Sequence, residues 1–277
     1  MIQISAKSEL FYGVTAPTSF IFNIAPAATD YQKVFDENLT ISPKIKYSWC
    51  DLNGFGSRGI RLNVEPCDLK IAYSAKVSLF PEINPPKTLG EVDYPELPVE
   101  VLPFLNPSRY CESDQLGQFA WNEFAGVPSG HSRVQAVADW VNKNIAYVSG
   151  VTDVSSSARD VLIQRTGVCR DFAHVSITLC RALGIPARYV SGYAVGLEPP
   201  DFHGFFEAYL EGRWYLFDAT KMAPVGGFVR IGVGRDAADA SFSTIVGQAQ
   251  LQSISVSAYS NQSIDQVNKG GSAISTA

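Results

Sequence analysis

Seven prolines lie between residues 81 and 107, and no other feature of this 277-residue chain limits its fold as strongly. Proline has no backbone N–H and a fixed φ, so neither a continuous helix nor a central strand can pass through this segment. The residue patterns before and after it also differ. The sequence therefore predicts a first domain over residues 1–105, a second over 106–250, and a Ser-, Asn- and Gly-rich tail over 251–277 that is expected to be partly disordered.

Short runs of β-forming residues recur in the N-terminal region, and turn sequences such as Asp51-Leu52-Asn53-Gly54 separate them. Regular strand spacing without helical periodicity is typical of a β-sandwich or a β-barrel. We therefore expect an all-β, sandwich-like N-terminal domain. Its predicted strands cover residues 19–24, 44–49, 59–64 and 70–79.

After the proline-rich segment the apolar residues adopt a helical spacing. This spacing predicts helices over residues 113–124, 132–145, 157–165 and 169–183. Gly167 is expected to follow the third helix as its left-handed C-terminal residue. Strands are then predicted over residues 187–193, 204–210, 213–218 and 228–233. Helices followed by an antiparallel sheet define an α+β fold.

The charge of the chain argues against two classes of partner. Its formal net charge is −5, and lysine and arginine form no cluster along the sequence. Nucleic acids and anionic membranes bind such clusters, so we expect neither as the main partner. The uncharged segment 10–29 follows Glu9 and is interrupted by Pro17 and several polar residues, which fits neither a membrane-spanning helix nor a secretory signal. We therefore expect a cytoplasmic protein.

Five cysteines and three histidines are available for covalent or metal chemistry. An odd number of cysteines without a Cys-x-x-Cys pair suggests neither a disulfide framework nor a zinc site. We therefore expect reduced thiols, no metal and no cofactor. Nothing in the sequence indicates the oligomeric state.

Cys169 is the first residue of a predicted helix and directly follows Gly167-Val168. Free backbone N–H groups and the positive end of the helix dipole favour a thiolate there, and the same N–H groups can stabilise an oxyanion. Arg170 would add to this effect and Asp171 would oppose it. From position alone, a buried structural cysteine remains the alternative. Cys180 lies inside the same helix beside apolar residues and is expected to belong to the core.

A thiol nucleophile needs a base, and the base needs an orienting group. His203 and Asp218 lie on either side of Glu211-Gly212, a predicted two-residue hairpin turn. If Leu210 pairs with Arg213, His203 and Asp218 are diagonal neighbours on one face, with Cβ atoms roughly 7–8 Å apart or somewhat less. A slip of one residue would place them on opposite faces. Taken singly, His203 also fits a surface histidine and Asp218 a turn residue at a strand end.

Four sequence blocks together resemble the transglutaminase-like superfamily, and most of all its bacterial transglutaminase-like cysteine proteases. The blocks are TGVCRDFAH at 166–174, RALGIPARYVSGY at 181–193, DFH at 201–203 and RWYLFD at 213–218. The resemblance covers about residues 130–235, and the N-terminal region resembles the domain that precedes this core in the bacterial family. It implies a papain-like fold, with Cys169 as nucleophile, His203 as general base and acid, and Asp218 orienting the imidazole.

Two positions depart from the family pattern. Members commonly have Ala-Trp after the histidine and Pro-Thr after the aspartate, where this chain has Gly204-Phe205 and Ala219-Thr220. Neither departure removes a catalytic atom. Phe205 changes the wall of the cleft, so the substrate specificity of the family is not carried over.

The resemblance implies a hydrolase of amide bonds that acts on a peptide or protein substrate, at peptide or isopeptide bonds. One alternative is a transferase that passes the acyl group to an amine, and another is a non-catalytic binding module. An amine site usually needs an acidic or aromatic recess. The sequence offers Glu198, Asp201 and Glu207 near the motif, which is little support for such a site, so hydrolysis is favoured.

Three further residues near the motif carry expectations of their own. Tyr147 is a candidate side-chain donor to the oxyanion, with buried packing as the alternative. His174 lies about 140° around the helix from Cys169 and is expected to point away from the thiol as a hydrogen-bonded structural residue. His131 is expected at the surface near a helix start.

Overall fold

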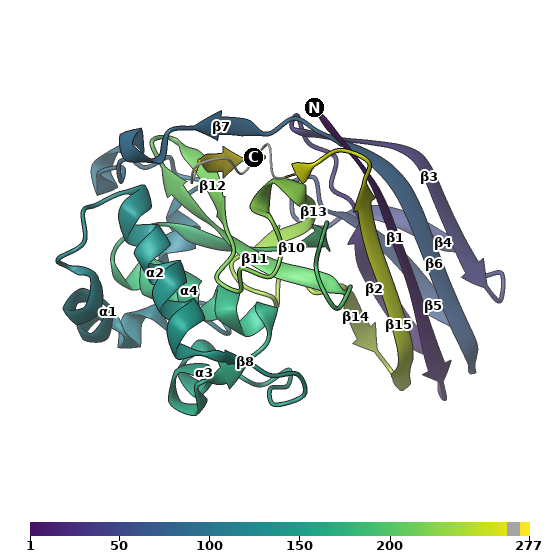
Figure 1. Ribbon diagram of the computed structural model, residues 1–277. Coiled ribbons are helices and arrows are strands. Elements are labelled where there is room, and N and C mark those ends of the chain that lie inside the picture. Colours follow the sequence, from purple (N-terminus) through teal and green to yellow (C-terminus); the bar gives the residue numbers. More distant parts are fainter. Residues whose placement is uncertain (265–271) are drawn as a thin grey trace.

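The computed structural model describes residues 1–264 and 272–277. It has an N-terminal, strand-rich part beside a part in which helices pack on an antiparallel sheet (Figure 1). The α+β class predicted from the sequence is therefore confirmed. Within the described residues, no helix is long and apolar enough to cross a membrane.

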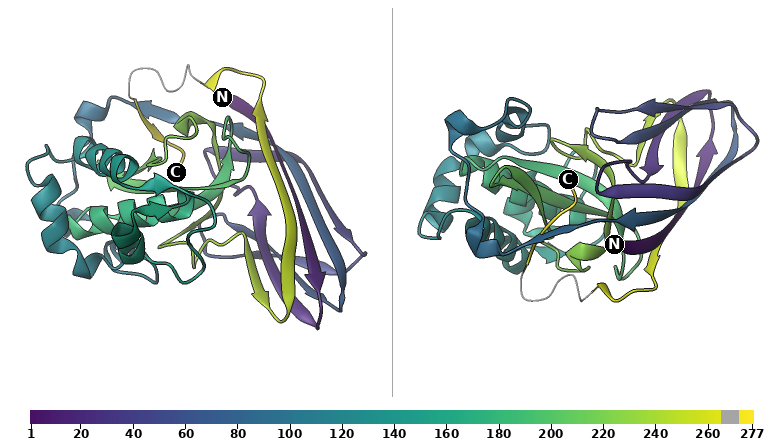
Figure 2. Two further views of the ribbon diagram at one scale, coloured as in Figure 1. Left: turned by 60° about the horizontal axis from the view of Figure 1, so that its bottom comes forward. Right: turned by 90° about the horizontal axis from the view of Figure 1, so that it is seen from above.

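The N-terminal part is built from two four-stranded sheets (Figure 2). The first has the order β15-β1-β6-β3 and contains β1 (Ile2–Val14), β3 (Gln32–Ser42), β6 (Cys67–Leu79) and β15 (Ala249–Ser260). The second has the order β14-β2-β5-β4 and contains β2 (Thr18–Ala25), β4 (Tyr47–Asp51), β5 (Arg58–Val64) and β14 (Ser243–Val246). Alternating inward residues such as Leu10, Tyr12, Phe20 and Phe22 form the core between the sheets.

The segment 251–277, expected to be a partly disordered tail, contains most of β15 and a further short strand. β15 runs antiparallel to β1, from Ile4 opposite Ser260 to Val14 opposite Ala249, and the two strands lie side by side in Figure 1. β16 (Ala273–Ser275) pairs with β7 (Glu82–Asn84). In β15 the serines alternate with Ile254, Val256 and Ala258, which face the core, and this period of two makes a strand. Residues 265–271 of the predicted tail lie outside the described residues.

The proline-rich segment contains β7 and a series of short 3₁₀ turns at residues 86–88, 94–96 and 102–105. It leads to the helices α1 (Gly117–Phe124), α2 (His131–Asn144), α3 (Ala158–Gln164) and α4 (Cys169–Ala182). The predicted role of Gly167 is wrong, because the left-handed residue after α3 is Arg165, with φ of 58°. Gly167 belongs to β9 (Thr166–Gly167), which pairs in parallel with β8 (Ala146–Tyr147).

The sheet of the second part has the order β12-β11-β10-β13. Its strands are β10 (Ala187–Ala194), β11 (Phe202–Leu210), β12 (Arg213–Phe217) and β13 (Phe228–Gly234). Leu210 pairs with Arg213, so the predicted hairpin register is confirmed. Both turn residues have positive φ, 47° at Glu211 and 80° at Gly212, as a tight hairpin requires.

Helix α4 lies against β10 and β11 and forms the centre of the second core (Figure 1). Phe172, Val175 and Leu179 of α4 are buried in one cluster with Phe206 and Ala208 of β11. This packing brings the N-terminal end of α4, where Cys169 lies, toward the beginning of β11, where His203 lies.

Candidate active site

Cys169 is the first residue of α4 and is partly exposed. The N-terminus of the helix is capped by Asp171, whose Oδ2 accepts the backbone N–H of Val168 at 2.9 Å. A Cβ atom on Gly167 would lie 2.8 Å from Cβ of Asp171, so only glycine allows this close approach. The sequence before the cysteine thus fixes the backbone that carries the thiol.

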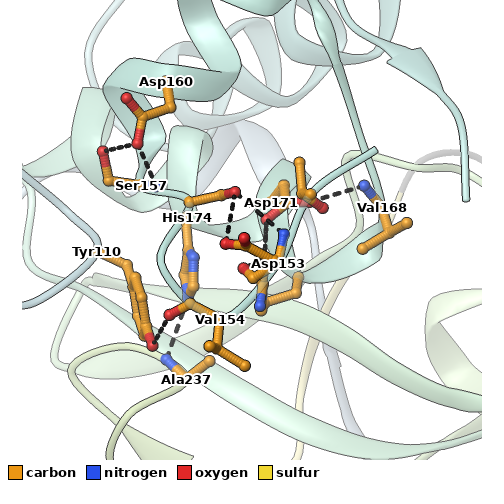
Figure 3. Close-up of polar contacts among 12 residues, drawn as sticks. Tyr110, Asp153, Val154, Ser157, Asp160, Val168, Asp171, His174 and Ala237 are labelled. Atoms are coloured by element: carbon orange, nitrogen blue, oxygen red, sulfur yellow. Dashed lines mark hydrogen bonds and ion pairs between the residues drawn. The ribbon is translucent and has the colours of Figure 1, made fainter. Parts of the chain in front are cut away.

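Asp171 also binds the loop that covers this end of the helix (Figure 3). Its carboxylate is fully buried and accepts hydrogen bonds from Thr152 Oγ1 at 2.6 Å and from Arg170 Nε at 3.0 Å. Arg170 Nη2 donates in turn to the carbonyl of Asp153 at 2.7 Å. Arg170 and Asp171 therefore form an ion pair with each other.

Replacing Asp171 with alanine should destabilise the protein by about 3–5 kcal/mol, because Arg170 and the N–H of Val168 lose a buried partner. Urea unfolding measures this loss. Asp160→Ala is the matched control, since the exposed Asp160 accepts the backbone N–H of Ser157 at the start of α3 and such a cap contributes about 1 kcal/mol. Equal losses in the two variants would contradict the importance of the Asp171 contacts.

His203 and Asp218 meet in the structure as the hairpin register predicts. Nε2 of His203 lies 3.0 Å from Oδ2 of Asp218, and both side chains are buried. The other carboxylate oxygen, Oδ1, accepts the backbone N–H of Thr220 at 2.9 Å and its hydroxyl at 2.8 Å. Asp218 is therefore held by the turn that follows β12, with one oxygen turned to the imidazole.

The second ring nitrogen of His203, Nδ1, is buried and has no hydrogen bond of normal geometry among the described residues. Burial lowers the pKa of His203, but the neighbouring carboxylate of Asp218 and thiol of Cys169 outweigh it and raise the pKa to about 10. His203 thus lies between the carboxylate and the thiol. The three residues singled out in the sequence are brought together.

Tyr147 lies beside the same thiol. Its ring packs against Phe172 at 5.8 Å between centroids, and the side chain is partly exposed. Burial and the neighbouring Cys169 thiol both raise the pKa of its hydroxyl, and the hydroxyl is also within hydrogen-bonding reach of the Cys169 backbone. The alternative of buried packing is therefore wrong, because Tyr147 is 41% exposed, and its role as a donor to the oxyanion stays a prediction.

The remaining histidines and Cys180 have distinct positions. His174 is buried and its Nε2 accepts the backbone N–H of Ala237 at 3.1 Å, which confirms a hydrogen-bonded structural role. Burial lowers the pKa of His174 to about 3. Cys180 is fully buried, as expected. The expectation of a surface position for His131 is wrong, because it is buried with its ring 4.9 Å from that of Phe217.

Sequence reasoning missed Tyr189, a buried residue of β10 whose hydroxyl pKa is raised by burial and by Cys169. A Cβ atom on Gly204 would lie 2.6 Å from this hydroxyl and 3.2 Å from Cα of Arg170. Gly204, where the family commonly has alanine, thus makes room for Tyr189 behind the helix terminus. The departure of Gly204 from the alanine of the family was the sequence signal that could have indicated Tyr189.

Within residues 1–264 and 272–277, no group of three or more His, Cys, Asp or Glu side chains could hold a metal ion.

Comparison with known proteins agrees with this geometry. The model of the transglutaminase-like superfamily matches residues 118–219, and that of the bacterial transglutaminase N-terminal domain matches residues 2–99. A crystal structure of a candidate cysteine protease from Cytophaga hutchinsonii is 39% identical, with a TM-score of 0.94 over 99% of this chain and 97% of that chain. The chain therefore belongs to the transglutaminase-like superfamily.

Two uncharacterized mycobacterial proteins are similar over shorter stretches. The chain is 38% identical to the protein of Mycobacterium leprae over 144 residues, which are 49% of this chain and 51% of that protein. It is 42% identical to the protein of Mycobacterium bovis over 96 residues, which are 35% and 30% of the respective lengths. The chain thus spans about half or less of the length of these curated relatives.

Proposed function

We propose that this protein is a cysteine hydrolase of amide bonds that acts on peptide or isopeptide bonds through a thioester intermediate. The observation that carries the proposal is the position of His203, whose Nε2 contacts Asp218 and whose pKa is raised by Asp218 and by the thiol of Cys169. A buried imidazole between a carboxylate and a thiol at a helix N-terminus is suited to activate that thiol.

In the proposed reaction, His203 takes the proton of the thiol at Nδ1, and the Cys169 thiolate attacks the amide carbonyl. The backbone N–H of Cys169 and the hydroxyl of Tyr147 are the candidate donors to the resulting oxyanion. Because its pKa is raised, Tyr147 keeps its proton and can donate it in a hydrogen bond. His203 then protonates the leaving amine as the C–N bond breaks. Water, deprotonated by the same imidazole, finally hydrolyses the thioester.

Transfer of the acyl group to an amine would need a site for the incoming ammonium. Of the acidic residues near the motif, Glu207 is buried and bound to Arg188 and Arg230, so it offers no free carboxylate. Burial raises the pKa of Asp201, and the hydrogen bond from the N–H of Phe202 and the charge of His203 offset part of this rise. Glu198 is exposed in the loop before β11, which leaves Asp201 as the acidic side chain beside His203. One such side chain is little for an amine subsite, and this favours hydrolysis.

The share of the acyl group that passes to water rather than to an amine distinguishes hydrolysis from transfer. With a peptide that acylates Cys169, we expect the free acid to remain the main product when a primary amine is added at millimolar concentration. Water is present at about 55 M, and only a bound, oriented amine reaches the effective molarity needed to compete. Mass spectrometry quantifies both products. Asp201→Asn is the control variant, because it removes the acidic side chain that could bind an amine weakly. Amide as the main product at millimolar amine would replace the hydrolase with a transferase.

A further inference from the structure

The face of the β12-β11-β10-β13 sheet that is turned away from α4 carries a core cluster of its own. Phe205 and Phe206 are neighbours in β11, so their side chains point to opposite faces of the sheet. Phe206 packs with α4, whereas Phe205 is 1% exposed in a separate cluster with Phe228 and Ile274. Phe205 is therefore a core residue and not the wall of the cleft that the sequence suggested.

The imidazole of His203 packs against two phenyl rings of this cluster. His203 lies two residues before Phe205 in β11 and therefore on the same face of the sheet. The centroid of its ring is 5.4 Å from that of Phe228 and 6.5 Å from that of Phe205, and the two phenyl rings are 4.4 Å apart. These distances are typical of aromatic contacts in protein cores.

Gly192 of β10 makes room for this arrangement. It pairs with His203 of β11 on one side and with Arg230 of β13 on the other. A Cβ atom on Gly192 would lie 3.0 Å from Cε1 of Phe205 and would also meet the carbonyl oxygen of Val229. Any side chain at this position would therefore displace β13 or the Phe205 ring, and glycine is the residue that allows the ring to lie beside His203.

The hydrogen bonds of His203 leave the orientation of its ring open. Nε2 is bonded to Asp218, and Nδ1 has no hydrogen bond of normal geometry among the described residues. The torsion that turns an imidazole about its Cβ–Cγ bond has broad minima, so one bond at one nitrogen does not fix where the other nitrogen points. Packing against the two phenyl rings supplies the remaining constraint, which matters because a small displacement of a catalytic group costs much of the rate.

Ile274 of β16 supports the two phenyl rings. It is 2% exposed and belongs to the same core cluster as the rings. β16 pairs with β7, where Ile274 lies opposite Ile83, and it also contacts β12 (Figure 1). Thr276, directly after β16, accepts a hydrogen bond from Nη2 of Arg230 at 3.1 Å. β16 is therefore fixed on the face of the sheet that carries His203.

We propose that Phe205 and Phe228 are positioning residues for His203. The two rings hold the imidazole so that Nδ1 faces the thiol of Cys169, and Ile274 of β16 acts on the imidazole through the rings. This inference rests on the role of His203 as the base in the proposed function. It gives β16, which follows the site residues far along the chain, a part in activating the thiol.

Alkylation by iodoacetamide tests this role without a substrate, with mass spectrometry of the cysteine peptides as the measurement. At about pH 6 the thiolate of Cys169 needs the imidazole to hold its proton, whereas at about pH 10 a thiolate forms without it. We expect Phe205→Leu to slow alkylation of Cys169 at the lower pH roughly 3- to 10-fold, the effect of one lost aromatic contact, and to leave the rate at the higher pH unchanged. A merely structural role would not change the ratio of the two rates.

Ile274→Ala should change the ratio in the same direction, and Ile274→Val, which keeps most of the side chain, should restore it. Ile83→Ala is the matched control, because Ile83 lies opposite Ile274 but is 50% exposed and outside the cluster. It should keep the wild-type ratio. Cys180 reports folding in the same experiment, since it is fully buried and reacts when the chain unfolds. If Phe205→Leu exposes Cys180, Phe228→Leu takes its place.

Two contrary outcomes are distinguishable. If wild-type Cys169 reacts no faster at the lower pH than the partly exposed cysteines of the N-terminal part, His203 is not the base, and the proposed function and the positioning role both fail. If wild-type Cys169 reacts faster than these cysteines, but the folded Phe205→Leu and Ile274→Ala variants keep the wild-type ratio, the positioning role alone is overturned.

Discussion

Replacing His203 with alanine is expected to lower amide turnover by roughly 10³-fold or more, to the background level. The imidazole is the proposed acceptor of the thiol proton and donor to the leaving amine, and no other histidine is in a position to replace it. His174 is bonded to the backbone of Ala237, and His131 packs on Phe217. Release of new amino groups from a peptide mixture measures the loss.

Asp218→Asn is expected to leave a small, measurable activity. Asp218 accepts from His203 through Oδ2 and from the backbone N–H of Thr220 through Oδ1. An amide has one oxygen and one NH₂ group, so it cannot accept on both sides. If its oxygen stays on Thr220, its NH₂ faces Nε2 and forces the proton of a neutral His203 onto Nδ1, where it cannot accept the thiol proton. Only the minor fraction with the other tautomer remains active.

His131→Gln is the matched control for both variants, because it changes another buried histidine that contacts none of the three site residues through a hydrogen bond. It should retain most of the wild-type turnover. Full turnover in His203→Ala would refute the assignment of the base, whatever the result for Asp218→Asn.

The sequence predicted the candidate site well because its geometry is local. Glu211-Gly212 is a turn that fixes the pairing of Leu210 with Arg213, and this register alone places His203 near Asp218. Cys169 was predicted at a helix start from the glycine before it and the apolar spacing after it. By contrast, the contacts of Asp171 with Thr152 depend on the path of a loop, which tertiary packing determines. The burial of His131 depends on Phe217, which is far along the chain.

The limits of fold prediction lie mainly in the N-terminal part. The predicted strands 19–24, 59–64 and 70–79 correspond to β2, β5 and β6, whereas β1 and β3 were missed. In β1, inward residues such as Ile4, Ala6 and Ser8 include small and polar side chains, which weaken the alternation. β15 was missed because its many serines were taken as a sign of disorder, although its residues alternate with the period of two that is typical of a strand. Its partner β1 lies at the opposite end of the sequence, so no local pattern indicates the pairing.

A covalent thioester on Cys169 is the second expected result with a large effect. Of the thiols in the candidate site region, Cys169 is partly exposed at a helix N-terminus, whereas Cys180 of the same helix is fully buried and burial raises its pKa. Only a thiolate that the substrate can reach forms an acyl-enzyme. The acyl group should therefore be found on Cys169 and be absent from Cys180.

The most direct measurement is rapid acid quenching of the protein during incubation with a peptide mixture, followed by mass spectrometry of the intact chain and of its Cys169 peptide. We predict a mass increase on Cys169 that matches an acyl group and is removed by neutral hydroxylamine, as a thioester is. It should persist in Cys180→Ala and vanish in Cys169→Ala. No adduct at any quench time while amide bonds are cleaved, or an adduct that survives in Cys169→Ala, would contradict the proposed mechanism.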